Sequence, residues 1–453
     1  MLRSILHSLR RMAVVAFVAE MFAASHLTAV ENATFAPCVP LPSTAEAVAM
    51  LPKLREPPDT ELPAWARALA PTLPHTAAAM LELDYKYRTV PPEQLRLRSL
   101  ARLAVAQVNR SLYGEAYARA DLARCGAGEL AATDADTVAK LPPLERDVYE
   151  FATQMTLAGR DATDSQVAAL REALGEENLV GLVLHIGYGN FQDRLVHALR
   201  LPIESQGPLA PIAVDFFDST PNGRNTPAAD RGESAPPASP GGGAVKQVHL
   251  ADAWEDLDAA QIQTKLDSQR GRAARIRVPD WEEIAPKLPE GLYSRPMRIR
   301  WSRVVVGYQP VLGPAWIKCL RVFEQEAHQD RVFEESVFWV VTRGLKCFYC
   351  MGHCEMLMEV GGLDAGQIAE RTTRLASGDW SSFTPAEQAA FGFAHKMTTD
   401  PASVGCDDFA ALREALGNHR AVDCVWWVSR CQFMTKVSDA FQLQLEEENV
   451  FAD

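Results

Sequence analysis

The chain has 453 residues, enough for two or three domains of ordinary size, and its hydrophobic content of 47% can build sizeable cores. The net charge is −13 and no long basic run occurs, which argues against nucleic-acid binding, because that needs Lys and Arg clustered on one face. Nine cysteines is an odd, modest number, and their spacing is not that of a disulfide-stapled secreted scaffold. We therefore expect most of the nine to be reduced core thiols.

Residues 1–35 form a possible signal or leader segment. Arg3, Arg10 and Arg11 precede a short apolar run, as in a secretion signal, but Glu20 interrupts that run. A surface helix fits the same residues, and the balance slightly favours a cytoplasmic protein over an exported one. No other run is apolar enough to span a membrane.

Residues 36–204 are predicted to form a helical domain. Apolar residues recur there at three- and four-residue spacing, and alternating strand patterns are nearly absent. Pro142-Pro143 indicates a helix with proline in its first turn, and Thr163 begins another that Gly175 ends. The pattern favours an all-α fold.

Residues 205–291 are predicted to be a linker and connector. The composition from 215 to 245 is rich in Pro, Gly, Ser and Ala, which is typical of a flexible segment. Residues 246–291 hold one short helical pattern followed by a polar, proline-broken stretch. We expect this connector to pack on a domain surface.

Residues 292–453 repeat the first domain. The heptapeptide ALREALG occurs at 169–175 and again at 411–417, an offset of 242. Further pairs at that offset include Phe191 with Phe433, and an offset of 236 pairs Trp65 with Trp301 and Tyr113 with Tyr349 upstream. This is an internal duplication of about 160 residues, so two tandem helical domains are expected.

A dithiol motif lies in the second copy, within the stretch EESVFWVVTRGLKCFYCMGHCEMLMEVGG at 334–362. Cys347 and Cys350 are three residues apart, which on a helix places them on one face, one turn from each other. Gly344 is predicted to end the preceding helix, so that Cys347 begins the next one. Free N–H groups and the helix dipole at such a start favour a thiolate, and Lys346 adds a positive charge beside it. The pattern indicates an outer nucleophilic thiol and an inner resolving thiol.

With Glu335 separated from this CxxC pair by eleven residues and His353 after it, the motif resembles the active-site signature of the carboxymuconolactone decarboxylase superfamily, in its alkylhydroperoxidase D-like branch. That family is all-helical and usually oligomeric, and its redox members use a glutamate, a CxxC pair and a histidine as a proton relay. The resemblance implies catalytic roles for Glu335, Cys347, Cys350 and His353. One position departs from the pattern: in the redox members the relay histidine is four residues after the second cysteine, where this chain has Cys354.

The duplication allows the two copies to be compared at this motif. Each redox-capable group falls on a residue without that chemistry: Glu335 on Ser99, Cys347 on Ser111, Cys350 on Gly114, His353 on Tyr117 and Cys354 on Ala118. The first copy is therefore predicted to supply packing surface rather than thiol chemistry. Because members of the resembled family are oligomers, the resemblance implies an intrachain pseudo-dimer and a homo-oligomer.

Other interpretations of these residues stay open. Cys347, Cys350, His353 and Cys354 are possible zinc ligands, but four ligands on one short helix cannot easily surround a tetrahedral ion, so we expect no metal. Cys354 is either a core thiol or a third redox thiol, Glu335 either a solvated carboxylate or a buried base, and His353 either structural or part of a relay. The remaining cysteines belong to no paired motif: Cys38, Cys125, Cys319, Cys406, Cys424 and Cys431.

The leading functional hypothesis is a thiol-dependent peroxidase or disulfide reductase, an antioxidant oxidoreductase without a bound cofactor. Its partners would be a peroxide or disulfide substrate and an external dithiol or lipoyl-type reductant. One alternative is the resembled family's other chemistry, decarboxylation of a lactone acid, which needs proton donors and an anion site rather than two thiols. The other alternative is a non-catalytic helical binding protein.

Overall fold

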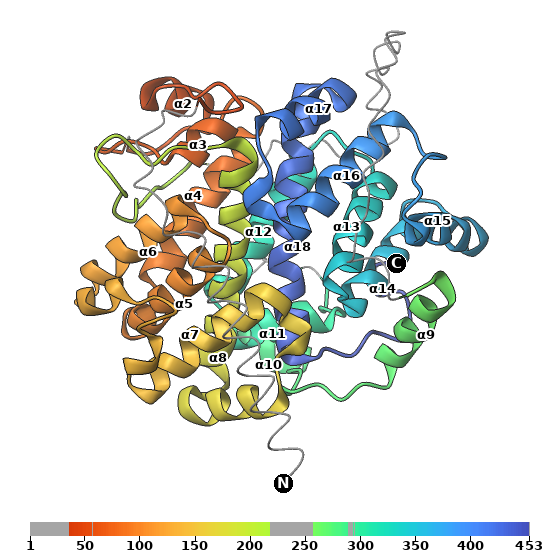
Figure 1. The fold of residues 1–453 in the computed structure, drawn as a ribbon, viewed down its shortest axis with the longest axis horizontal. Coiled ribbons are helices and arrows are strands. Elements are labelled where there is room, and N and C mark those ends of the chain that lie inside the picture. The colour runs from red at the N-terminus through yellow and green to blue at the C-terminus, as the bar shows by residue number, and fades with distance from the viewer. Residues whose placement is uncertain (1–35, 57, 218–256, 289–292, 294, 453) are drawn as a thin grey trace.

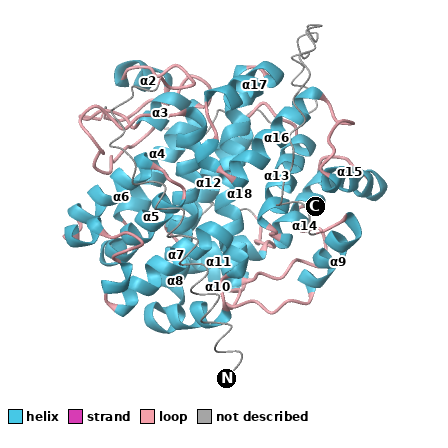
Figure 2. Cartoon of the chain, in the orientation of Figure 1, coloured by secondary structure: helices cyan, strands magenta, loops and turns pink. Residues whose placement is uncertain are grey.

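The structure is a computed structural model that describes residues 36–452 except 57, 218–256, 289–292 and 294. The regular secondary structure of the described chain is helical (Figure 2). Its one β-type pairing is an isolated antiparallel bridge between Leu54 and Phe216. The all-α prediction is confirmed. Within the described ranges, no helix combines the length and the apolar character needed to cross a membrane. The possible leader at 1–35 lies outside the described residues.

The described residues of the first half form seven α-helices. They are α2 Thr44–Met50, α3 Ala64–Leu69, α4 Pro74–Thr89, α5 Leu95–Val108, α6 Leu112–Arg124, α7 Pro143–Ala158 and α8 Asp164–Leu199. A 3-10 turn, η4 (Gly159–Asp161), joins α7 to α8. Proline opens α7 and a Thr163–Gln166 capping box opens α8, as the sequence signals predict.

The rest of the described chain contributes ten α-helices. They are α9 Ala259–Arg270, α10 Trp281–Ile284, α11 Arg300–Tyr308, α12 Leu312–Glu326, α13 Arg331–Leu345, α14 Phe348–Val360, α15 Ala365–Ser377, α16 Pro385–Thr399, α17 Cys406–Leu416 and α18 Asn418–Phe441. The first two belong to the predicted connector.

Helix bounds recur at the two sequence offsets. At 236 residues α6 maps onto α14 end to end, and at 242 residues the ends of α8 map onto the start of α17 and the end of α18. The kink between α17 and α18 at Gly417 has φ 79° and ψ 167°, and Gly175 inside α8 has φ 76° and ψ 163°. Glycine suits both positions because a side chain disfavours this backbone conformation. Local geometry thus repeats along with sequence.

The two halves pack through their longest helices. In Figure 1, α8 and α18 run side by side through the middle of the molecule, with α4 to α7 on one side and α13 to α16 on the other. Aromatic rings fill this contact: Phe191 of α8 lies edge-on to Trp426, with ring centroids 5.6 Å apart. Buried apolar side chains from both halves form one continuous core, so each half depends on the other for burial.

Part of the predicted linker and connector is ordered against the helices. Phe216 is buried beside Leu54, so the first residues of the 215–245 segment pack on the first half, while 218–245 lie outside the described residues. Between α9 and α10, Arg275 donates from its backbone N to the Phe441 carbonyl (2.8 Å) and from its guanidinium to the Ala162 carbonyl (2.7 Å). The connector therefore clamps the end of α18 to the start of α8.

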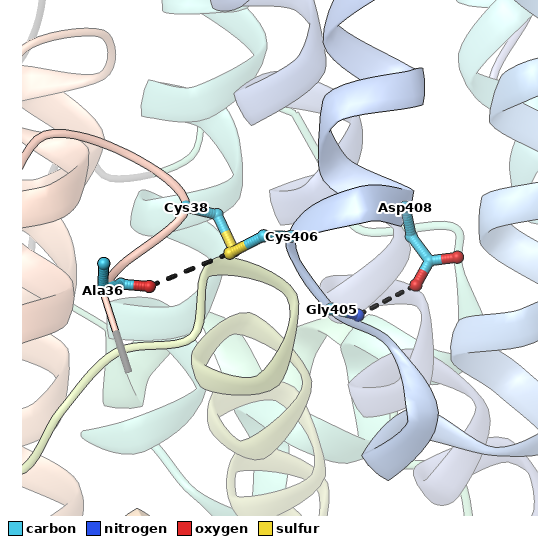
Figure 3. Close-up of a disulfide and its surroundings, with 5 residues drawn as sticks. All are labelled: Ala36, Cys38, Gly405, Cys406 and Asp408. Atoms are coloured by element: carbon cyan, nitrogen blue, oxygen red, sulfur yellow. Dashed lines mark hydrogen bonds between the residues drawn. A yellow bond between two sulfur atoms is a disulfide. The ribbon is translucent and has the colours of Figure 1, made fainter. Parts of the chain in front are cut away.

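A disulfide joins distant parts of the chain. Cys38, just before α2, is bonded to Cys406 at the start of α17, 368 residues away (Figure 3). Sequence spacing could not reveal this pair, because neither cysteine belongs to a motif. The other seven cysteines are free, six of them in the second half.

Candidate active site

The turn between α13 and α14 places the outer cysteine. The prediction that Gly344 ends the helix is wrong: α13 continues to Leu345, and Lys346 turns the chain with a left-handed φ of 55°. The glycine instead serves packing, since a Cβ at Gly344 would lie 3.1 Å from the methyl group of Thr398. Cys347 then occupies the N-cap of α14, as predicted.

Both motif cysteines are buried together. Cys347 and Cys350 are 1% and 3% exposed, one helical turn apart. The Sγ of Cys350 lies 3.1 Å from the Oγ of Ser438 on α18. Burial raises the pKa of the Cys347 thiol well above its usual value, and the neighbouring side chain of Cys350 adds to this, whereas the backbone N–H of Cys350 opposes it. The helix start does not by itself yield a thiolate, so the site needs a base.

A carboxylate on α18 meets that need. The side chain of Asp439 is buried beside Cys347, and each of the two groups acts on the pKa of the other. Burial raises the pKa of Asp439 to about 6, against the opposing charge of Lys436 one turn earlier and the interaction with Cys347. Burial in turn lowers the pKa of Lys436 to about 7. A base whose pKa lies near neutrality beside a protonated thiol is the arrangement that general-base catalysis requires.

The first half forms one wall of this site. The ammonium of Lys436 donates to the carbonyl of Thr156 near the end of α7 (3.3 Å). At Gly159, a Cβ would lie 3.4 Å from the Cβ of Asp439, and the neighbouring Arg160 helps to lower the pKa of that carboxylate. Residues of both halves therefore fix the Lys436–Asp439 pair beside the thiols.

His353 faces away from the sulfurs. Its Nε2 is 2.6 Å from Glu446, which also accepts from the Tyr349 hydroxyl (3.2 Å) and the Arg300 backbone N (2.7 Å). Among the described residues, no hydrogen bond links His353 to Cys347 or Cys350. Burial opposes ionisation of Glu446, but the bond from His353 holds its pKa below the usual range.

The first half repeats this arrangement with tyrosine in the histidine's place. Glu204, the equivalent of Glu446, accepts from the hydroxyls of Tyr113 (2.7 Å) and Tyr117 (2.6 Å) and from the Ala64 backbone N (2.7 Å). Tyr117 is the equivalent of His353. Because a half without the thiol pair keeps the same bonds, the geometry favours the structural interpretation of His353.

Glu335 lies within α13. It is fully buried, its Oε1 is 3.3 Å from Arg331, and its Oε2 has no hydrogen-bond partner in the described part of the chain. Burial raises its pKa, with the charge of Arg331 opposing. Burial also raises the pKa of Cys354, and the charge of Glu335 adds to this rise more than any other charge. Glu335 thus acts on Cys354, one turn beyond Cys350, and is not among the main groups that shift the pKa of Cys347.

In the first half an ion pair fills the space of the inner sulfur. Ser111, at the position of Cys347, caps α6 by accepting from the Gly114 backbone N (3.1 Å). Over Gly114, at the position of Cys350, the buried guanidinium of Arg102 binds Asp193 at 2.5 and 3.0 Å. A Cβ at Gly114 would lie 2.2 Å from Asp193. This half could not hold a second sulfur without losing that pair.

Replacing Gly114 by alanine should therefore destabilise the protein. The methyl group would displace the Arg102–Asp193 pair, and we expect a loss of about 3 kcal/mol in the free energy of unfolding. The matched control is Gly128→Ala, where a Cβ would meet nothing closer than 3.9 Å, and its change should stay within about 0.5 kcal/mol. Denaturant unfolding measures both, and equal stability of the two variants would contradict the crowded geometry.

Sequence reasoning missed Asp439, Lys436 and Glu446. A usable signal existed for the first two: they are charged residues three apart in α18, a helix whose neighbouring positions are mostly apolar. Glu446 pairs with Glu204 at the offset of 242.

Comparisons with known protein families, with curated proteins and with solved structures find no match to this chain.

Proposed function

We propose that this protein is a thiol-dependent oxidoreductase, a peroxidase or disulfide reductase of the alkylhydroperoxidase D-like type, with Cys347 as nucleophile. The observation that carries the proposal is the buried cluster of Asp439, Cys347 and Cys350 at the start of α14, in which Asp439 and Cys350 both act on the Cys347 thiol. Two thiols within bonding reach and an adjacent base are what thiol exchange chemistry needs.

In the proposed reaction Asp439 takes the proton of Cys347. The thiolate attacks one peroxide oxygen, the O–O bond breaks, and the departing alkoxide leaves as an alcohol after taking that proton. Cys347 is then a sulfenic acid. The sulfur of Cys350 attacks it, a disulfide forms, and the hydroxyl leaves as water with the proton of Cys350. An external dithiol or lipoyl-type reductant restores both thiols by exchange.

Glu335 is proposed to serve the inner thiol. Its charge acts on Cys354, and Cys354 follows Cys350 by one helical turn, so Glu335 is proposed as the buried acceptor for a proton from Cys350. His353 is proposed to hold the loop after α18 in place through Glu446. The resemblance implied Glu335 and His353 as the proton relay, whereas the proposed mechanism uses Asp439 as the main base.

We further propose that the chain is a tandem of two related helical domains that form a pseudo-dimer. The recurring helix bounds and the kinks at Gly175 and Gly417 support it, as does the central packing of α8 against α18. In this arrangement the first domain no longer reacts but supplies Thr156 and Gly159 to the site of the second.

The disulfide bears on where the protein works. Disulfides such as Cys38–Cys406 persist mainly in oxidising compartments, so the pair supports export over retention in the cytoplasm. The reductant for Cys347 and Cys350 would then be a dithiol carrier of that compartment.

Peroxide turnover with several candidate reductants tests the proposed function. Purified protein is mixed with hydrogen peroxide or an alkyl hydroperoxide and either a small dithiol, a dithiol protein or dihydrolipoamide. Catalytic peroxide loss that depends on the reductant supports an oxidoreductase. Absence of turnover with every pair, in protein whose Cys347 and Cys350 remain reduced after peroxide, would favour the binding-protein alternative.

A further inference from the structure

A second polar cluster lies far from the thiols, in the core of the first half. Arg98 of α5, Tyr87 of α4 and His185 of α8 are 1%, 0% and 5% exposed. The guanidinium of Arg98 donates one hydrogen bond, from Nη1 to the Val90 carbonyl (2.8 Å). Within the described residues, its Nε and Nη2 have no partner, nor do the Tyr87 hydroxyl and the His185 Nδ1.

The three side chains converge on one place. Nη2 of Arg98 lies against Gly181, where a Cβ would be only 2.0 Å away, and His185 is one turn further along the same face of α8. The rings of Tyr87 and His185 are nearly parallel, with centroids 6.0 Å apart. Tyr87 is also three residues before Val90, whose carbonyl holds the guanidinium. The cluster is thus closed by α4, α5 and α8.

The second half carries different side chains at the equivalent place. Phe323 and Trp427 are the equivalents of Tyr87 and His185, and their rings stack in the same way, at 5.9 Å. There the indole Nε1 donates to the carbonyl of Glu334, the equivalent of Arg98 (2.7 Å). The first half therefore has an imidazole where the second has a larger indole, and a phenol where the second has a phenyl ring. It has the guanidinium of Arg98 where the second half has the carboxyl group of Glu334, whereas in the second half the guanidinium of Arg430 stacks on Trp427, 3.8 Å from the ring centroid.

A buried guanidinium needs a negative partner. Charges removed from water are stable only when paired and hydrogen-bonded. Among the described residues, no carboxylate lies within ion-pair distance of Arg98, and the one that acts on it most, Glu93, is exposed. The unpartnered Nε and Nη2 form one edge of the guanidinium, the edge that binds a carboxylate through two parallel hydrogen bonds.

We propose that Arg98, Tyr87 and His185 form a binding site for a small carboxylate of about the size of formate or acetate. Arg98 binds both oxygens, and the Tyr87 hydroxyl donates to one of them. His185 closes the site, and its small ring leaves the space that the indole of Trp427 fills in the other half. This site is independent of the thiol chemistry, because it uses none of the residues around Cys347.

Thermal unfolding of the full chain tests the site. Protein prepared without carboxylate buffers is unfolded in increasing sodium formate or acetate, with sodium chloride keeping the ionic strength constant. A ligand that binds only the folded state raises the unfolding temperature in a saturable way. We expect such a rise for the unmodified chain and for Arg124→Met, in which an exposed arginine is removed.

Three variants in the cluster separate binding from a general salt effect. Arg98→Met should lose the saturable rise, and His185→Trp should lose it by filling the space as Trp427 does. Tyr87→Phe should raise the half-saturating concentration about tenfold, the effect of one hydrogen bond to a charged group. No saturable rise in the unmodified chain, or the same rise in Arg98→Met or His185→Trp as in Arg124→Met, would overturn the proposal. If Arg98→Met does not fold, the His185 and Tyr87 variants decide.

Discussion

Cys347→Ser should abolish peroxide turnover, because a hydroxyl beside Asp439 cannot replace a thiolate as nucleophile toward the O–O bond. Cys350→Ser should let Cys347 react once and then leave it as a sulfenic acid or mixed disulfide, since no resolving sulfur remains one turn away. The measurement is reductant-coupled peroxide consumption, with mass spectrometry of the trapped Cys347.

The first half offers a matched control for this pair of variants. Ser111→Ala removes only the cap of α6, so turnover should be unchanged, although stability should fall by about 1 kcal/mol. Full turnover in Cys347→Ser would refute the assignment of the nucleophile. Loss of turnover in folded Ser111→Ala would refute the view that the first half lacks chemistry of its own.

Asp439→Asn should lower kcat/KM about 10²–10⁴-fold, the usual contribution of a positioned general base. The pKa of Asp439 is raised to about 6, so in the unmodified protein the ionised base is lost as the pH falls through that value. We therefore expect kcat/KM to rise with pH around 6 and this rise to vanish in Asp439→Asn. A pH series of initial rates, with the fold checked by thermal unfolding, measures both effects.

His353→Tyr is the matched control for the base, because it copies Tyr117 of the first half. The tyrosine hydroxyl should keep the bond to Glu446, and turnover should stay within about threefold of the unmodified rate. If Asp439→Asn is as active as the unmodified protein while a folded His353→Tyr is inactive, the histidine relay implied by the resemblance is correct and the Asp439 assignment fails.

Helical periodicity predicted the fold class, and residues typical of helix starts and ends predicted that α14 begins at Cys347. Both features depend on local sequence. The end of α13 was misplaced because Gly344 does not end the helix; it allows the helix to pack closely against Thr398. The disulfide partner of Cys38 could not be predicted, since pairing over 368 residues depends on how the halves pack.

The base at the thiol site could not be assigned from sequence either. Asp439 lies 92 residues after Cys347 along the chain, and only the packing of α18 against α14 brings their side chains together. Burial then decides the charge states: it raises the pKa of Cys347 and of Asp439 together, so that a helix start alone does not supply the thiolate. The approach of Asp439 to Cys347 and the burial of both groups depend on tertiary packing, which local sequence does not reveal.

Counting thiols before and after peroxide tests the central claim most directly. All nine cysteines are accounted for: two form the Cys38–Cys406 disulfide and seven are free. Alkylation under denaturing, non-reducing conditions should therefore label seven thiols in reduced-site protein and five after one equivalent of peroxide, with peptide mapping assigning the new disulfide to Cys347 and Cys350. Seven labelled thiols after peroxide, or a new disulfide that joins other cysteines such as Cys354 and Cys431, would contradict the account.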